Sequence, residues 1–204
     1  MSTVCLIKSN EIVNGEHMMY HNINLNTWDS DLELLEEAYG MFASCYNLSA
    51  FSAKTPKLTN GKRMFFEVGV PNWSNGDIRT IKMDFDSLSN GYEMFANGGK
   101  IELVSRTPLN YHFEFPSLTQ GCGMFCNTLS VGVRSENDTE CVQIDYLRFP
   151  SLIDATEMFV GANKTQNNHI SFTNSDMFPV ATNFEKTFYT AKIASFDLEL
   201  LTGK

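Results

Sequence analysis

The sequence has no long apolar run and few basic residues. No stretch approaches the roughly 20 consecutive apolar residues that a membrane-spanning helix requires. The apolar patch at residues 4–7 has no basic segment before it and no small-residue cleavage site after it, so we expect no signal peptide. The formal net charge is −9, from 15 Lys and Arg against 24 Asp and Glu. Binding to a phosphate backbone or an anionic bilayer depends on clustered cations, so we expect neither nucleic acid nor a membrane surface as a partner.

Cysteine is sparse and irregularly spaced. The five cysteines are an odd number in a chain of 204 residues, which favours reduced thiols over a disulfide framework. A chain of this length buries roughly 70% of its unfolded surface and needs no covalent link to hold its core. Cys122 and Cys126 could offer two soft ligands one helical turn apart, but no second pair completes a tetrahedral metal site. We expect neither a metal nor another cofactor.

What the sequence does contain is a repeated dipeptide. Methionine is followed by phenylalanine six times, whereas random placement of 10 Met and 16 Phe in this chain predicts fewer than one such pair. Internal duplication explains the excess. The six pairs are Met41-Phe42, Met64-Phe65, Met94-Phe95, Met124-Phe125, Met158-Phe159 and Met177-Phe178.

Two further residues recur with the first five pairs. A leucine lies six residues before each methionine, and a Gly or Ala lies three residues before it. Leucine, the small residue and phenylalanine therefore fall at i, i+3 and i+7, which is one stripe of a helix. We expect two helical turns in each unit, with the small residue allowing a neighbouring unit to approach closely. The leucines are Leu35, Leu58, Leu88, Leu118 and Leu152, and the small residues are Ala38, Gly61, Gly91, Gly121 and Ala155.

Extended runs lie between these units. Apolar and polar residues alternate at 81–85, 111–115, 142–146 and 170–172, which predicts β-strands. Pro116 and Pro150 mark the turns into the next helices. Second extended runs at 67–70, 101–105 and 129–133 are joined to the following strands by polar turns, which predicts β-hairpin excursions.

The predicted fold is an α/β repeat, a leucine-rich-repeat-like solenoid with one short strand and one short helix in each coil. We expect a single domain with an N-terminal cap at 1–27 and about six repeats at 28–188, the last of them decayed. Residues 189–204 would form a C-terminal cap strand and tail, because a stack of repeats must cover its terminal apolar faces.

The segment Met41-Phe42-Ala43-Ser44-Cys45-Tyr46-Asn47-Leu48 resembles the Met-Phe-x-x-Cys-x-x-Leu repeat of the BspA-like leucine-rich repeat family, which is widespread in surface proteins of gut bacteria and in their phages. The resemblance covers residues 28–188, but only the first unit has the full motif. It implies a curved stack whose parallel strands form one face, used for adhesion or for binding another protein. It brings no catalytic residues.

These observations favour a non-catalytic recognition or adhesion module, of phage origin, with a protein or cell-surface glycan as its partner. One alternative is a structural virion component of a capsid, tail or fibre that packs against other virion proteins or copies of itself. The expected lack of a signal peptide favours a chain that is cytoplasmic or assembled into a virion. The second alternative is an unrecognised enzyme, although Gly-x-Ser-x-Gly, His-Glu-x-x-His and Walker motifs are absent and the four histidines are dispersed.

Side chains on the predicted strands are candidate contact residues. The simpler interpretation is a solvated strand face, but an acidic column there would suit a basic or hydroxyl-rich partner. Tryptophan is frequent at binding hot spots, so a tryptophan in a polar turn is a further candidate contact residue. The candidates are Asp84, Glu114 and Asp145 in the acidic column, Lys82 and His112 in the column beside it, and Trp73 in the turn.

Overall fold

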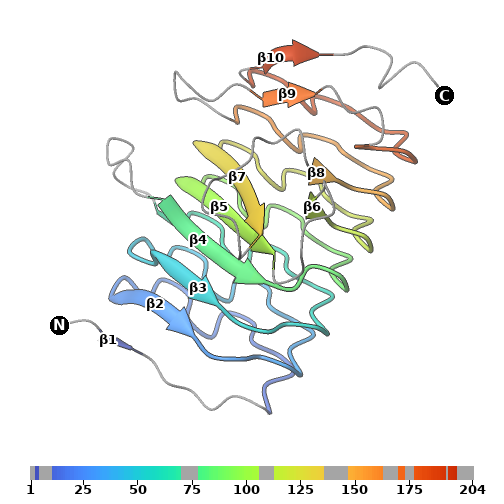
Figure 1. The fold of residues 1–204 in the computed structure, drawn as a ribbon. Helices are drawn as coiled ribbons and strands as arrows, with labels where there is room; N and C mark the ends of the chain where they lie inside the picture. Colours follow the sequence, from blue (N-terminus) through green and yellow to red (C-terminus); the bar gives the residue numbers. More distant parts are fainter. Residues whose placement is uncertain are drawn as a thin grey trace.

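The computed structural model describes residues 3–4, 11–69, 78–105, 113–135, 147–162, 170–172, 177–191 and 193–196. Within these ranges every regular element is a β-strand (Figure 1). The strands are β1 (Thr3–Val4), β2 (Leu25–Asp29), β3 (Ala50–Ser52), β4 (Ile78–Met83), β5 (Lys100–Ser105), β6 (Phe113–Glu114), β7 (Ser130–Ser135), β8 (Leu147–Arg148), β9 (Ile170–Phe172) and β10 (Ile193–Phe196).

All strand pairs in the described ranges are parallel. The strands β1, β2, β3, β4, β5 and β7 form one six-stranded sheet in that order, while β6 pairs with β8 and β9 pairs with β10. The hairpin excursion predicted from 101–105 and 111–115 is wrong, because β5 and β6 belong to different sheets. The one predicted from 67–70 is also wrong, because residues 67–69 form turns and no strand. The segment 142–146, which was expected to pair with 129–133, lies outside the described residues. Parallel partners require a long connection, so each strand takes its register from a neighbouring coil of chain and not from a tight turn.

A second ladder lies outside the strands. Seven residues form a continuous series of parallel bridges along the stack. Each of these bridge residues marks one coil, and we number the coils 1 to 7 in sequence order. Figure 1 shows the coils following one another from the blue end of the stack to the red end. The bridge residues are Asn14, Glu37, Asn60, Asn90, Gln120, Asp154 and Asn183.

The predicted helix in each coil is wrong. The residues after each bridge residue form a series of turns, which we call the turn segment. In all seven coils the third and seventh residues after the bridge residue have a positive φ, between 50° and 63°. A left-handed residue at every fourth position interrupts an α-helix, and it costs roughly 1–2 kcal/mol where the residue is not glycine. Eleven of these fourteen residues are not glycine, so contacts between coils must hold the conformation.

Hydrogen bonds between coils hold the turn segments. Amides at the first, third, fifth and seventh positions after the bridge residue donate to carbonyls of the next coil, at 2.8 to 3.0 Å in coil 2. In coil 2 the amides at the fourth, sixth and eighth positions donate to the carbonyl three residues earlier, as Met41 does to Ala38 at 3.0 Å. The backbone therefore satisfies its polar groups without a helix, but only when the next coil is present. The donors of coil 2 are Ala38, Gly40, Phe42 and Ser44.

An Asn or Asp at the bridge position starts the turn segment in five coils. Its side-chain oxygen accepts a hydrogen bond from the amide two residues later, at 2.8 to 3.1 Å. This is an Asx turn, which directs the chain away from a helix. The five residues are Asn14, Asn60, Asn90, Asp154 and Asn183.

The repeated apolar residues form the core, as predicted. The five leucines and the methionines of coils 2 to 6 are at most 1% exposed. The phenylalanine rings stack on one another from coil to coil, with centroids 5.4 to 5.8 Å apart and planes 2° to 13° from parallel. The sixth pair departs from this pattern, because Phe178 stacks on Phe149 in a separate column. The stacked rings of the main column are Phe42, Phe65, Phe95, Phe125, Phe159 and Phe188.

The residue after the bridge residue is small because the next coil lies against it. A Cβ added to Gly91 would lie 3.1 Å from both Leu118 Cδ1 and Met124 Sδ of the next coil. The predicted close approach at this position is confirmed. Coil 7 has Phe184 at this position, and its ring centroid lies 5.7 Å from that of Phe178. Its ring takes the space in which the leucine and methionine of a further coil would lie.

The first coil lies within the segment that was expected to be a cap. Residues 11–23 contain Asn14 as bridge residue, the small residue Gly15, and positive φ angles at His17 and His21. Met18 is 37% exposed, whereas the corresponding methionines of coils 2 to 6 are buried. The segment is therefore built as a repeat, and it lies at one end of the turn-segment stack.

Candidate binding surface

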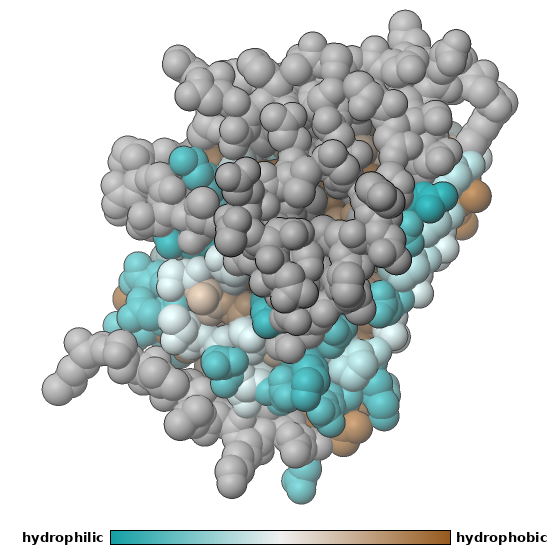
Figure 2. Space-filling model, viewed as in Figure 1, coloured by the Kyte–Doolittle hydropathy of each residue, from teal (hydrophilic) through white to brown (hydrophobic). Residues whose placement is uncertain are grey.

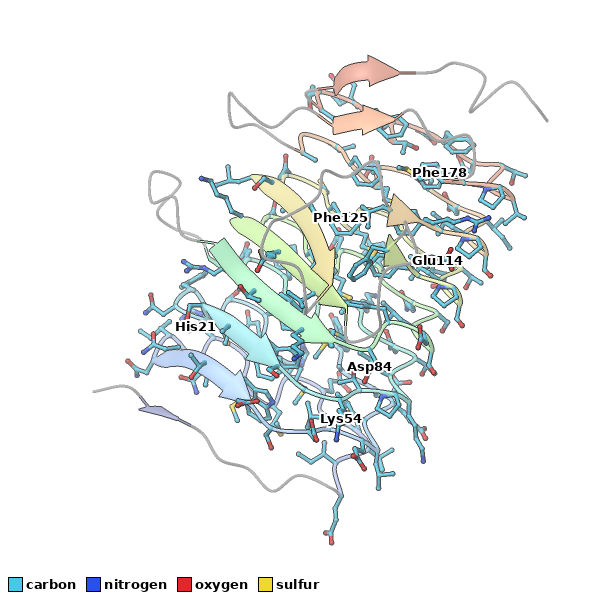
Figure 3. The ribbon with its side chains drawn as sticks, viewed as in Figure 1. His21, Lys54, Asp84, Glu114, Phe125 and Phe178 are labelled. Atoms are coloured by element: carbon cyan, nitrogen blue, oxygen red, sulfur yellow. The ribbon has the colours of Figure 1, made fainter. Side chains whose placement is uncertain are left out.

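The side of the stack where the strands end carries charged residues. Figure 3 shows Lys54, Asp84 and Glu114 following one another along this side. Glu114 is opposite Arg148 in the register of β6 and β8, and the two side chains form an ion pair at 3.1 Å. Arg148 therefore occupies the place in the acidic column where Asp145 was expected. Lys54 pairs with an aspartate of the preceding coil at 3.0 Å, so these charges connect coils.

Asp84 also connects two coils. Its carboxylate accepts a hydrogen bond from the amide of Thr55 at 2.8 Å, and the hydroxyl of Thr55 donates to the carbonyl of Asp84 at 3.1 Å. Thr55 is only 1% exposed. The Asp84 carboxylate therefore satisfies a buried amide of the preceding coil, which gives it a structural role.

Of the remaining predicted contact residues, only Lys82 lies in the described ranges, where it is a half-buried residue of β4. His112, Asp145 and Trp73 lie outside the described residues. On the face drawn in Figure 2, the described surface is mainly hydrophilic to neutral, with small scattered hydrophobic spots. The described part of that face therefore has no broad apolar patch of the kind that marks an interface.

A groove lies on the turn segments of coils 1 to 3. Its volume is about 630 Å³, within the range of roughly 300–1,000 Å³ of ligand sites. The small residues Gly40 and Ala43 of coil 2 are in register with His17 and Tyr20 of coil 1, and with Arg63 and Phe66 of coil 3. The hollow exists because coil 2 has small side chains where both neighbouring coils have large ones.

Aromatic rings line the coil 1 side of the groove. The ring of His17 covers Gly40, since a Cβ there would lie 2.5 Å from His17 Cδ2. His17 contacts Tyr39 and Tyr20, with ring centroids 4.8 Å and 5.5 Å apart. The ammonium of Lys62 lies 5.4 Å from the centroid of Tyr39. Tyr39 is thus held by its neighbours, while Tyr20 is 58% exposed and presents its ring to solvent.

The coil 3 side of the groove carries one charge of each sign. Arg63 donates through Nε to Glu93 of coil 4, and its guanidinium lies 5.2 Å from the ring centroid of Phe66. The hydrogen bond to Glu93 raises the pKa of Arg63. Glu67 accepts a hydrogen bond from the hydroxyl of Ser44 at 3.0 Å. Both charged groups are therefore held in place at the edge of the hollow.

Two of the described thiols, Cys45 and Cys122, have little nucleophilic character. Burial raises the pKa of Cys45 to about 11, and burial also raises the pKa of Cys122. The thiolate is the reactive form, so a raised pKa lowers reactivity at neutral pH. Across the described part of the chain, no group of three His, Cys, Asp or Glu side chains is placed to hold a metal ion. The described residues also include no helix with the length and apolar character needed to cross a membrane.

None of the groove residues is among the contact residues predicted from the sequence. Coil 1 has Met18-Met19 in place of Met-Phe, so the dipeptide pattern did not reveal it. A signal was nevertheless present, because Asn14-Gly15 lies ahead of Met18 at the spacing that Asn60-Gly61 has ahead of Met64. The shared Asn-Gly step would have extended the repeat to coil 1 and placed its side chains beside those of coil 2.

A comparison with models of protein families, with curated proteins and with solved structures finds no match. The resemblance to the BspA-like family therefore stays a prediction from the repeat residues.

Proposed function

We propose that the chain is a non-catalytic recognition module that binds a protein or glycan partner in the groove on coils 1 to 3. The supporting observation is that one hollow combines an exposed tyrosine, Tyr20, with two charged groups, Arg63 and Glu67, that the fold holds in place. Concave sites with aromatic walls and a few fixed polar groups are typical of ligand binding.

The chemistry of the groove favours binding over catalysis. The hydroxyl of Ser44 donates to Glu67, but Ser44 is only 5% exposed, so this oxygen is poorly placed to attack a bound molecule. Arg63 is engaged by Glu93. On the strand-end side, Glu114 and Asp84 are used in contacts between coils, which leaves the groove as the better candidate.

A structural virion component that stacks on copies of itself is the alternative. Within the described residues, the carbonyls of Glu16 and Tyr20 in coil 1 and the amides of Lys186 and Thr190 in coil 7 make no backbone hydrogen bond. These groups would be complementary in an end-to-end stack. Phe184 opposes that arrangement, because its ring occupies the position that every other coil keeps small.

The proposal is tested by filling the groove. Ala43→Phe places in coil 2 the residue that coil 3 has at the same position, so the column of turn segments should accept it. Ala96→Phe is the matched control, because Ala96 occupies this position in coil 4 and does not line the groove. The labelled chain is applied to an array of extracellular-matrix proteins, bacterial surface proteins and oligosaccharides. We expect binding that Ala43→Phe abolishes and Ala96→Phe keeps. No binding by the unaltered chain, or equal binding by both variants, would overturn the proposal.

A further inference from the structure

We infer that the occupant of the groove is an uncharged sugar ring, presented as part of a glycan. This inference rests on the proposed function, because it names the class of partner for the same site. Two properties of the groove support it. One is the aromatic surface on the coil 1 side, and the other is the balance of charge on the coil 3 side.

The aromatic surface suits the apolar face of a sugar. A pyranose ring has C–H groups on one face and hydroxyls around its rim, so it needs an aromatic plane beside hydrogen-bonding groups. Tyr20 offers such a plane, since 58% of its surface is exposed. Its ring contacts His17 and His21 and lies at the edge of the groove. Aromatic rings of this kind contribute contact area at a low cost in conformational entropy.

The charges select against ions. Arg63 and Glu67 both come from coil 3 and both line the groove. Glu93 pairs with Arg63 and the ammonium of Lys62 lies over the ring of Tyr39, which adds one further charge of each sign beside the groove. Attraction to one sign of charge is therefore offset by repulsion from the other, so neither a cation nor an anion gains much net attraction. The net charge of −9 adds a long-range field that disfavours anions. A dipolar, uncharged ligand can use both groups at once.

The same two groups offer a donor and an acceptor for the hydroxyls of a sugar. Within the described residues the guanidinium of Arg63 donates only through Nε, to Glu93, which leaves its two terminal nitrogens as donors. Glu67 accepts from Ser44 through one oxygen and keeps its other oxygen as an acceptor. Donor and acceptor are already held by the fold, so binding costs little additional side-chain freedom.

The test uses two tyrosines at the same position of different coils. Tyr20 lies in coil 1 at the groove, and Tyr189 lies in coil 7, six residues after its bridge residue, and is 64% exposed. Tyr20→Ala and Tyr189→Ala thus make the same change at similarly exposed sites. Each full-length variant is applied to an array that carries neutral oligosaccharides, acidic oligosaccharides and proteins, after thermal melts show that both variants are folded.

We expect the unaltered chain to bind neutral oligosaccharides, Tyr20→Ala to bind them at least about tenfold more weakly, and Tyr189→Ala to bind them equally well. Binding to proteins alone, or to acidic sugars alone, would overturn the sugar assignment and leave the recognition function standing. Binding to neutral sugars that both variants retain would show that the sugar lies outside the groove. A chain that binds nothing on the array would overturn both proposals.

Discussion

Replacing a ring in the middle of the phenylalanine column should destabilise the chain more than the same change at a half-buried position outside the column. Phe95 is fully buried, and its ring stacks between those of Phe65 and Phe125, with centroids 5.7 Å and 5.5 Å away. Phe66 lies on the turn segment of coil 3, is half-buried, and contacts the guanidinium of Arg63. Phe95→Leu and Phe66→Leu therefore make one chemical change in two environments.

The size of the effect follows from the contacts. An aromatic pair contributes about 0.5–1.5 kcal/mol beyond burial, and Phe95→Leu removes two such pairs, which gives a loss of about 1–3 kcal/mol. Phe95→Ala also leaves a cavity, and buried Phe→Ala changes cost about 3–5 kcal/mol. Phe66→Leu removes the contact with the guanidinium of Arg63, which contributes about 0.5–1 kcal/mol at an exposed site, so it should cost less than Phe95→Leu.

Urea unfolding followed by far-UV circular dichroism measures these differences. Because adjacent coils depend on one another, we expect Phe95→Ala to shift the unfolding midpoint of the whole stack and not of one coil. If Phe95→Leu and Phe66→Leu lost the same free energy, the stacked rings could not be the continuous core that joins the coils.

Three other substitutions or conditions test separate features. Burial raises the pKa of Cys45 from 9.0 to about 11, so the folded state keeps a proton that the unfolded state loses, and the free energy of unfolding should fall as the pH rises from 9 to 11. Cys45→Ala should remove that decrease in a urea titration at each pH. Asp84→Asn should keep an acceptor for the amide of Thr55 and lose less thermal stability than Asp84→Ala, and equal melting temperatures would contradict the role given to this carboxylate. Phe184→Gly should allow end-to-end association, seen as a mass increase in light scattering, whereas an unchanged mass would show that Phe184 is not the block.

The apolar residues of the repeat could be predicted, but the backbone between them could not. Leu88, Gly91 and Phe95 are all buried, as their recurrence indicates. Their spacing also matches a helix, because overlapping turns with a left-handed residue at every fourth position bring the same residues to one side. Half of the fourteen left-handed residues are Gly, Asn or His, which favour positive φ, but Arg63, Glu93 and the others have no such preference, so residue type gives no consistent signal from coil to coil. The conformation comes from the hydrogen bonds of the neighbouring coil.

The register between neighbouring strands also differed from the prediction. The acidic column was obtained by aligning Asp145 with Glu114, whereas the structure pairs Glu114 with Arg148, three residues later. The stacking of Phe149 on Phe115 explains the difference, because both rings precede a Pro-Ser-Leu corner that fixes the coil. The groove could not be predicted from any single coil, since it arises from the contrast in side-chain size between coil 2 and its two neighbours.

The direction of the hydrogen bonds between turn segments has an electrostatic consequence. In the peptide group that joins Glu37 to Ala38, the oxygen accepts from coil 1 and the nitrogen donates to coil 3. Peptide groups at this and three further positions thus form head-to-tail chains along the stack, as they do along the axis of an α-helix, and their dipoles add. The turn-segment face should be partially negative at coil 1 and partially positive at coil 7. An anion is therefore favoured at the end of the molecule farthest from the groove.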